Sequence, residues 1–315
     1  MVLYSIRKLT GAIAVLLALS ALVFMAGRAL APGDPAQLIA GPKASPETVE
    51  NIRQSLGFDR PLVTQYLDWL GSALRGDLGT SPFSGQANRD VIAQQAPVSF
   101  QLALFGLLVA VAIGIPAGVY AATRAKQARV WAVRLPLLIA FAFPAFVSGS
   151  FALYVATHYL PNLYSPNYIP VSDGLLANAQ MMLLPVLAVG IPTAPLIMQM
   201  TRSAMLEVLA TPYISTARTN GIAEWRVTYV YALRAAMPPV LTLIGMIFGL
   251  LVGGLFIVEQ IFSLPGLGRG ILDSLELRDF SQATGQALVL ATAFILGNLL
   301  VDLMLPLVDR RITRS

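Results

Sequence analysis

Six apolar stretches recur along this 315-residue sequence, and each approaches or exceeds the roughly 20 residues that a helix needs to span a bilayer. Hydrophobic residues make up 56% of the chain and charged residues only 12%, a balance typical of a protein that crosses the membrane several times. Backbone polar groups in lipid must be satisfied within each segment, so the spans are predicted to be helices. The predicted spans are Leu9–Gly27, Val98–Thr123, Pro136–Thr157, Met182–Thr201, Val240–Val258 and Gln286–Val308.

Basic residues are distributed unevenly between the segments that connect these spans. Six spans place both termini on one side, which holds 13 basic residues against three acids, a net charge of +10. The opposite side holds eight basic residues against twelve acids. Because cytoplasmic segments collect Lys and Arg, both termini are predicted to be cytoplasmic. This topology accounts for the overall charge of +5 without nucleic acid as a partner.

The chain has no cysteine and one histidine, His158, so neither a thiolate site nor metal binding is expected. Its N-terminal run resembles a signal peptide. However, the apolar stretch Leu9–Gly27 is longer than the roughly 7–15 residues usual for the apolar region of such a peptide. We therefore expect residues 1–28 to remain as a first transmembrane helix, a signal anchor.

Residues 29–97 are predicted to form a small helical domain outside the membrane. Pro46 can start one helix, which Gly57 ends, and Pro61 can start another. The apolar residues of the second helix recur at helical spacing: Val63, Tyr66, Leu67, Leu70 and Leu74. We interpret this apolar face as packing against the domain or the membrane surface.

A polar and basic segment, residues 202–239, separates two apolar runs on the predicted cytoplasmic side. Thr211 can cap a helix and Pro212 suits its first turn. Gly221 can adopt the left-handed conformation that ends a helix. The pattern predicts about two turns of helix that project from the membrane. A second helical stretch, Ile222–Ala236, is predicted to lead back into it.

Short motifs occur in a definite order along the chain. They include Ala31-Pro32-Gly33-Asp34-Pro35, Leu56-Gly57-Phe58-Asp59-Arg60-Pro61-Leu62, Arg75-Gly76-Asp77-Leu78-Gly79 and Pro265-Gly266-Leu267-Gly268. Each motif is weak alone. In this order and spacing they resemble the inner-membrane permease subunits of binding-protein-dependent ABC importers, in the dipeptide/oligopeptide (peptide/nickel) branch. The resemblance runs nearly end to end.

This resemblance implies an all-α polytopic fold in the bacterial inner membrane, with six transmembrane helices of the type I ABC importer kind. The implied domains are the first helix 1–28, the extracytoplasmic domain 29–97, a five-helix core 98–308 that contains the loop 202–239, and a cytoplasmic tail 309–315. The implied function is that of a permease subunit for peptides, which forms half of the translocation pathway.

The polar segment resembles the family's ATPase-coupling loop, whose pattern is a Glu-Ala-Ala-like triplet, a Gly and a later Pro. Here the triplet is Ser215-Thr216-Ala217, with Gly221 and Pro239 in the other two positions. The resemblance implies that Arg218 and Asn220 supply polar contacts to a partner. The full set of implied coupling residues is Pro212, Tyr213, Ser215, Thr216, Ala217, Arg218, Asn220, Gly221 and Pro239.

The chain has no Gly-x-x-x-x-Gly-Lys-Ser/Thr sequence, so we expect it to bind no ATP by such a loop and to be no enzyme. The resemblance implies that ATP and Mg are bound by partner subunits and that this chain carries no cofactor. The implied partners are a second homologous permease, two ATPase subunits, an external substrate-binding protein, a peptide substrate and the lipid membrane. The sequence assigns no substrate-binding residue.

Two other classes of function are considered beside the importer. An ion-driven secondary transporter or channel acting alone calls for internal repeats and several buried ionisable residues, and Asp302 is the one acid inside a predicted span. A membrane-embedded hydrolase needs a nucleophile–base or metal-ligand set, which is missing.

Three further residue types have structural interpretations. Asp302 is predicted to pair with a basic residue rather than to carry a substrate. Glu259 is predicted to hold the turn Pro265–Gly268. Prolines in the spans, Pro144 among them, are interpreted as shaping packing, with bends along the pathway as the alternative.

Overall fold

A computed structural model describes residues 2–30, 34–41, 43–55, 57–125, 127–159 and 167–308. These residues are mostly helical, and no strand occurs among them, which confirms the predicted all-α fold. The helices are α1 (Val2–Leu30), α2 (Pro35–Ala40), α3 (Pro46–Ser55), α4 (Leu62–Leu74), α5 (Asn88–Thr123), α6 (Trp131–Ala142), α7 (Ala145–Tyr159), α8 (Leu175–Leu209), α9 (Pro212–Thr219), α10 (Glu224–Arg226), α11 (Leu233–Gly254), α12 (Phe256–Ile261), α13 (Leu267–Glu276) and α14 (Phe280–Val308).

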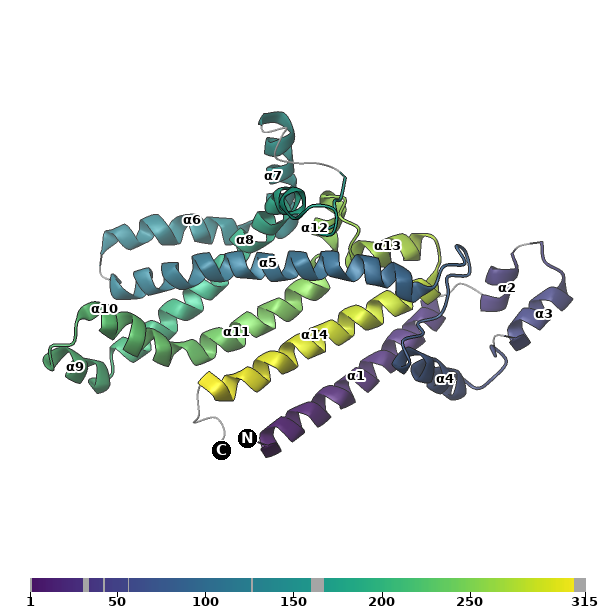
Figure 1. The fold of residues 1–315 in the computed structure, drawn as a ribbon, viewed down its shortest axis with the longest axis horizontal. Helices are drawn as coiled ribbons and strands as arrows, with labels where there is room; N and C mark the ends of the chain where they lie inside the picture. Colours follow the sequence, from purple (N-terminus) through teal and green to yellow (C-terminus); the bar gives the residue numbers. More distant parts are fainter. Residues whose placement is uncertain are drawn as a thin grey trace.

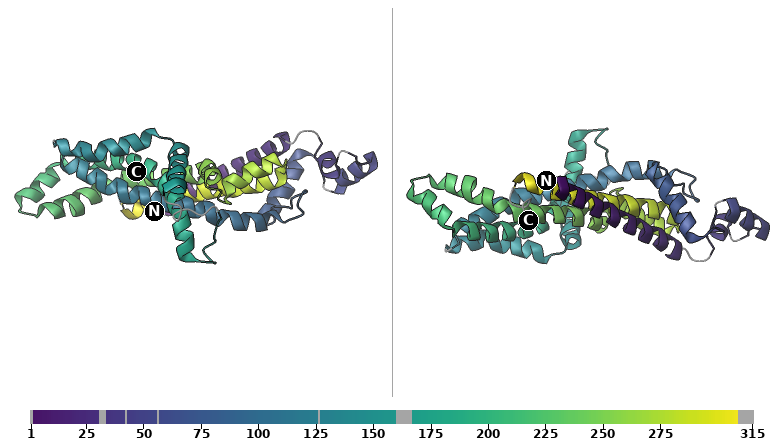
Figure 2. Two further views of the ribbon diagram at one scale, coloured as in Figure 1. Left: turned by 90° about the horizontal axis from the view of Figure 1, so that it is seen from above. Right: turned by 90° about the horizontal axis from the view of Figure 1, so that it is seen from below.

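The long helices run side by side along the molecule, and short helices lie at its two ends (Figure 1). One end carries α9 and α10 and is called the α9 end below. The other carries α2, α3 and α4 and is called the α4 end. Figure 2 shows that α2 and α3 extend beyond the bundle. Helix α1 begins, and helix α14 ends, on the side of the molecule toward the α9 end.

Five of the described helices are long and apolar enough to cross a membrane, and the bent pair α6–α7 makes a sixth if it counts as one span. Helix α5 has 36 residues, so it is about 54 Å long, whereas the hydrocarbon core of a bilayer is about 30 Å thick. It begins ten residues before the predicted second span. The predicted domain boundary at residue 97 therefore falls inside a continuous helix.

Helices α5 and α8 form the most extensive helix pair, and small residues allow their close approach. A Cβ atom at Gly114 would lie 2.8 Å from the carbonyl oxygen of Ala194, and one at Gly190 would lie 2.7 Å from the carbonyl oxygen of Gly106. Small residues at helical spacing let backbones pack closely where no hydrophobic effect drives association. The close packing of α5 against α8 therefore requires glycine at positions 114 and 190.

The predicted third span, Pro136–Thr157, is formed by two helices rather than by one continuous helix. Helices α6 and α7 meet at 101°. Phe143, at the C-terminus of α6, has φ −89° and ψ 120°, which is extended backbone. Proline disfavours the helical conformation in the residue before it, so Pro144 ends α6 at this point. Of the two interpretations of this proline, the structure favours the bend.

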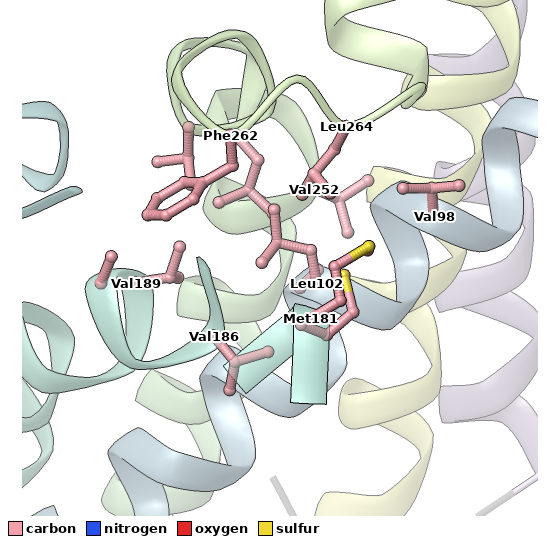
Figure 3. Close-up of a cluster of buried hydrophobic side chains, with 13 residues drawn as sticks. Val98, Leu102, Met181, Val186, Val189, Val252, Phe262 and Leu264 are labelled. Carbon is pink, nitrogen blue, oxygen red and sulfur yellow. The ribbon is translucent and has the colours of Figure 1, made fainter. Parts of the chain in front are cut away.

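Three clusters of buried apolar side chains follow one another along the bundle. In the cluster nearer the α4 end, side chains of α5, α8, α11 and the α12–α13 connection meet (Figure 3). A second cluster joins α5, α8 and α11 further along. The third lies at the α9 end and includes residues of α9 itself. The buried core thus extends from the α12–α13 connection to α9, the short helix predicted from the sequence.

The short helices at the α4 end begin as predicted. Helix α3 starts at Pro46, Gly57 has φ +68°, and Pro61 immediately precedes α4. The ring of Trp69 on α4 lies 5.4 Å, between centroids, from the ring of Phe24 on α1. The hydroxyl of Tyr66, also on α4, donates to a backbone carbonyl of α1. Aromatic contacts therefore join α4 to the first span.

Candidate functional site

Helix α9 spans Pro212–Thr219, the two turns that the sequence predicts. Pro212 occupies its first position, where a missing N–H costs no helical hydrogen bond. Thr211 is the N-cap residue by backbone conformation, with φ −75° and ψ 148°. Its side chain does not cap the helix, because the hydroxyl donates to the carbonyl of Val208 at 2.7 Å. Thr211 thus links α9 back to α8.

The C-terminus of α9 is closed by a Schellman motif. Gly221 has φ +74° and donates its N–H to the carbonyl of Arg218 at 3.0 Å. The N–H of Ile222 reaches the carbonyl of Ala217 at 3.2 Å. These two bonds satisfy carbonyls that a helix end would otherwise leave open. The predicted left-handed glycine is confirmed, and it gives α9 a defined end.

One face of α9 inserts into the bundle. Ile214 is fully buried and Ala217 nearly so. They pack in the cluster at the α9 end with residues of α5, α8, the segment that leads into α11, and α11 itself: Val119, Ala122, Ala204, Met205, Val227, Ala232 and Ala236. This face therefore joins α9 to a buried cluster that it shares with α5, α8 and α11.

The opposite face of α9 is exposed. Tyr213 is 56% exposed, and its ring lies 5.8 Å from the ring of Tyr231, between centroids. Ser215, Thr216 and Asn220 are exposed as well. The structure thus separates the predicted coupling residues into a buried anchor and a polar outer surface.

Arg218 does not stand free on this surface. Its guanidinium binds both carboxylate oxygens of Glu224, at 2.7 Å and 3.2 Å. This hydrogen bonding raises the pKa of Arg218 above its ordinary value. The pair bridges the turn between α9 and α10 and stiffens the loop, although exposed pairs contribute only about 0–1 kcal/mol. The guanidinium of Arg218, which the resemblance implies as a partner contact, therefore binds a carboxylate of its own chain.

The chain returns to the bundle through the predicted second helical stretch, which begins at Glu224 and is π-helical over Val227–Ala232. Pro239 lies beyond this segment, inside α11 and exposed. Single-turn π-helices are rare and occur often at functional sites. Pro239 thus belongs to the long helix α11 and not to α9.

Several residues of this region were not predicted from the sequence to take part in the site. Glu224 was not identified as the partner of Arg218, although the two flank Gly221 at a spacing that a tight turn closes. Trp225 and Tyr229 expose more than half of their surface beside α9. The sequence signal for them is an aromatic residue within a polar loop, because aromatic residues are enriched where proteins contact each other.

At the other end of the bundle, Glu259 holds the turn Pro265–Gly268, as predicted. Its carboxylate accepts from the hydroxyl of Ser99 at 2.5 Å and from the N–H of Arg269 at 2.8 Å. A Cβ atom at Gly266 would overlap this carboxylate. Glu259 is buried and serves the connection between α12 and α13.

The predicted role of Asp302 and the tail 309–315 lie outside the residues or side chains that the structure describes. Within the described chain, no group of three His, Cys, Asp or Glu side chains is arranged to hold a metal ion.

The chain matches two protein-family models. Residues 114–314 match the inner-membrane component of binding-protein-dependent transport systems. Residues 1–89 match the N-terminal part of such a membrane component. The first match alone covers more than half of the chain, and it includes the C-terminal part of α5 together with α8, α9 and α11.

Similar proteins match over nearly their whole length. A probable peptide ABC transporter permease of Sinorhizobium fredii is 33% identical over 98% of both chains. A putative peptide transport system permease of Brucella suis is 38% identical over 98% of both chains. A glutathione transport system permease of Shigella flexneri is 37% identical over 96% of this chain and 95% of its own. With its several apolar helices, the chain is a multi-pass membrane protein that belongs to the inner-membrane permease components of binding-protein-dependent transport systems.

Proposed function

We propose that this chain is one of two permease subunits of an ATP-driven peptide importer, and that α9 couples it to an ATPase subunit. The observation that carries the proposal is the construction of α9. Both ends of the helix are defined, one face is anchored among α5, α8 and α11, and the other is open at the end of the molecule. The names of its relatives support peptides as the substrate class.

The α9 end is proposed to face the cytoplasm. Basic residues of the described chain gather there at the ends of long helices and in the loops between them: Arg124, Arg129, Arg134, Arg202, Arg226 and Arg234. This distribution follows the preference of cytoplasmic segments for Lys and Arg. Both termini then lie in the cytoplasm, and the α4 end meets the external binding protein.

Movement of α9 is proposed to open and close the pathway. ATP and Mg are bound by two partner ATPase subunits, whose approach displaces the exposed face of α9. Because Ile214 and Ala217 share one packed cluster with residues of α5, α8 and α11, a shift of α9 would disturb the packing of these helices. Rigid-body movement of packed helices is a common form of switching between two states. A second, homologous permease provides the other half of the pathway.

The test compares two exposed aromatic rings in the complete importer. Tyr213→Ala removes a ring from the proposed ATPase contact, and Phe83→Ala removes an exposed ring at the α4 end. Because central aromatic residues contribute strongly to interfaces, Tyr213→Ala should reduce ATPase co-purification and ATP-driven peptide uptake by at least about tenfold. Phe83→Ala should leave co-purification unchanged.

Equal co-purification of both variants with the ATPases contradicts the assignment of α9. Peptide uptake by the isolated chain, driven by an ion gradient and without ATPases, supports the alternative of a transporter that acts alone.

A further inference from the structure

A large groove runs along α5 and α8, in the half nearer the α4 end. Its volume is about 1340 Å³. Residues of α5 between 91 and 112, the segment 168–172, the first turns of α8 and Pro265 line it. Pockets for small molecules usually enclose about 300–1,000 Å³, so this groove has room for a longer ligand.

The lining combines apolar walls with side-chain amides. Within the described chain, no Asp, Glu, Lys, Arg or His lines the groove. Leu104, Phe105 and Leu108 form its half-exposed apolar wall. Its polar groups include four carboxamides, from Gln94, Gln95, Gln101 and Asn178. A carboxamide both donates and accepts hydrogen bonds and carries no charge.

Hydrogen bonds with neighbouring groups hold three of these carboxamides in place. The Gln101 amino group donates to Asn178, whose own amino group donates to the carbonyl of Ile169 at 2.7 Å. The Gln95 carbonyl accepts from Gln286 at 2.8 Å. In these contacts Gln101 uses its donor and Gln95 uses its acceptor. Among the described residues, no hydrogen bond engages the Gln101 carbonyl, which remains as an acceptor for a ligand, whereas both heteroatoms of the Gln95 carboxamide lie against Gly270 of α13.

We propose that the backbone of the transported peptide binds along this groove, through the carboxamides of Gln94 and Gln101. Each peptide unit offers one N–H donor and one carbonyl acceptor, which the carboxamides match in kind. An uncharged lining does not select peptide side chains by charge, and apolar walls accept varied side chains. This inference rests on the proposed function and adds the residues that contact the substrate.

Two other occupants fit the same groove less well. Lipid acyl chains offer no hydrogen-bonding groups to carboxamides. A transmembrane helix of a partner satisfies its own backbone internally, so it offers no free backbone groups either. An extended peptide has unpaired backbone groups along its length. The carboxamides therefore favour a peptide.

The absence of cysteine from the chain allows a direct test. Gln101→Cys places a thiol in the groove, and Gln282→Cys places one on α14, at another partly buried carboxamide outside it. The complete importer is reconstituted in lipid nanodiscs with its binding protein. It is then supplied with a radiolabelled alanine tetrapeptide that carries a thiol-reactive bromoacetyl group.

The thiol at position 101 should be labelled at least about tenfold faster than the thiol at position 282, because a bound peptide holds the reactive group close to it. Unmodified alanine tetrapeptide should suppress this labelling. Equal labelling of the two variants, in complexes that still import the peptide, overturns the groove assignment and leaves the proposed function intact. Failure of the unaltered complex to import any peptide overturns both.

A second test asks whether the groove sets selectivity for charge. Gln94 is exposed in the lining, so Gln94→Glu introduces a charge with little structural cost. Relative to the unaltered complex, uptake of a lysine-containing tetrapeptide should rise by about three- to tenfold over that of a glutamate-containing one. Gln282→Glu is the control and should leave this ratio unchanged. A ratio that stays constant in both variants contradicts a substrate contact at Gln94.

Discussion

Helices α9 and α4 are both short, both lie outside the long helices, and both start beside a proline, yet they are joined to the bundle differently. Helix α9 buries Ile214 completely, in a cluster with residues of α5, α8 and α11. Helix α4 has no fully buried residue, and Val63 on it is 70% exposed. It contacts α1 through aromatic rings on the helix surface and through hydrogen bonds of Tyr66 and Gln65.

The comparison shows that amphipathic periodicity does not determine how firmly a helix is attached. A side chain inserted between helices cannot leave without opening the core, whereas a ring on a helix surface can slide or lift. Helix α9 is therefore suited to transmit a displacement. Helix α4, with its exposed apolar side chains, is suited to contact a partner or the membrane surface.

The largest expected effect comes from placing an acid in each helix. Ile214→Asp buries a carboxylate without a partner, which costs several kcal/mol, so α9 should detach from the bundle and ATP-driven uptake should fall by at least about tenfold. Val63→Asp, at an exposed position of α4, should change stability by no more than about 0.5 kcal/mol. Thermal unfolding and uptake by the reconstituted importer measure both. Similar losses in the two variants would remove the contrast.

A smaller effect is expected at the end of α9. Gly221 has φ +74°, and a Cβ atom there would meet nothing within 4 Å. The cost of Gly221→Val is therefore conformational rather than steric crowding, about 1–2 kcal/mol. Coupling should weaken, seen as more ATP hydrolysed per peptide imported. Gly221→Asn, which tolerates this conformation better, should be milder, and an equal defect in both variants argues against the conformational explanation.

A still smaller effect is expected where α4 contacts α1. Trp69→Ala removes the ring contact with Phe24, which contributes about 0.5–1.5 kcal/mol beyond burial. Hydrogen exchange should become faster in α4 and stay unchanged in α9. The double variant with Phe24→Ala should be less than additive. Full additivity shows that the two rings do not stabilise α4 through each other.

The smallest effect is a pH dependence at the α4 end. A hydrogen bond from Arg53 lowers the pKa of Asp34, which also accepts from the N–H of Ala36 at the start of α2. The lowered pKa means that this stabilisation is present above the ordinary pKa of Asp and is lost as the pH falls through the lowered value. The difference in thermal stability between the unaltered chain and Asp34→Asn should therefore shrink on acidification. A constant difference contradicts the linkage.

Local signals predicted the limits of α9 well. Pro212 and Gly221 act through their own backbone conformations, so their effects do not depend on the rest of the fold. The bend between α6 and α7 could not be predicted in this way. Pro144 interrupts a helix, whereas Pro192 and Pro195 lie inside the unbroken α8. Whether a proline breaks a span depends on neighbours that satisfy the freed backbone groups, and these are known only in three dimensions.

The sequence by itself determined the all-α membrane fold, the helical short loop at residues 212–221 and the family, because hydrophobic run lengths, helix ends and motif order are local properties. Only the tertiary structure decided that Ile214 anchors α9 and that Arg218 pairs with Glu224. It also brought Gln95, Gln101 and Asn178 into one groove. These contacts join residues from separate segments, and packing rather than sequence neighbourhood brings them together.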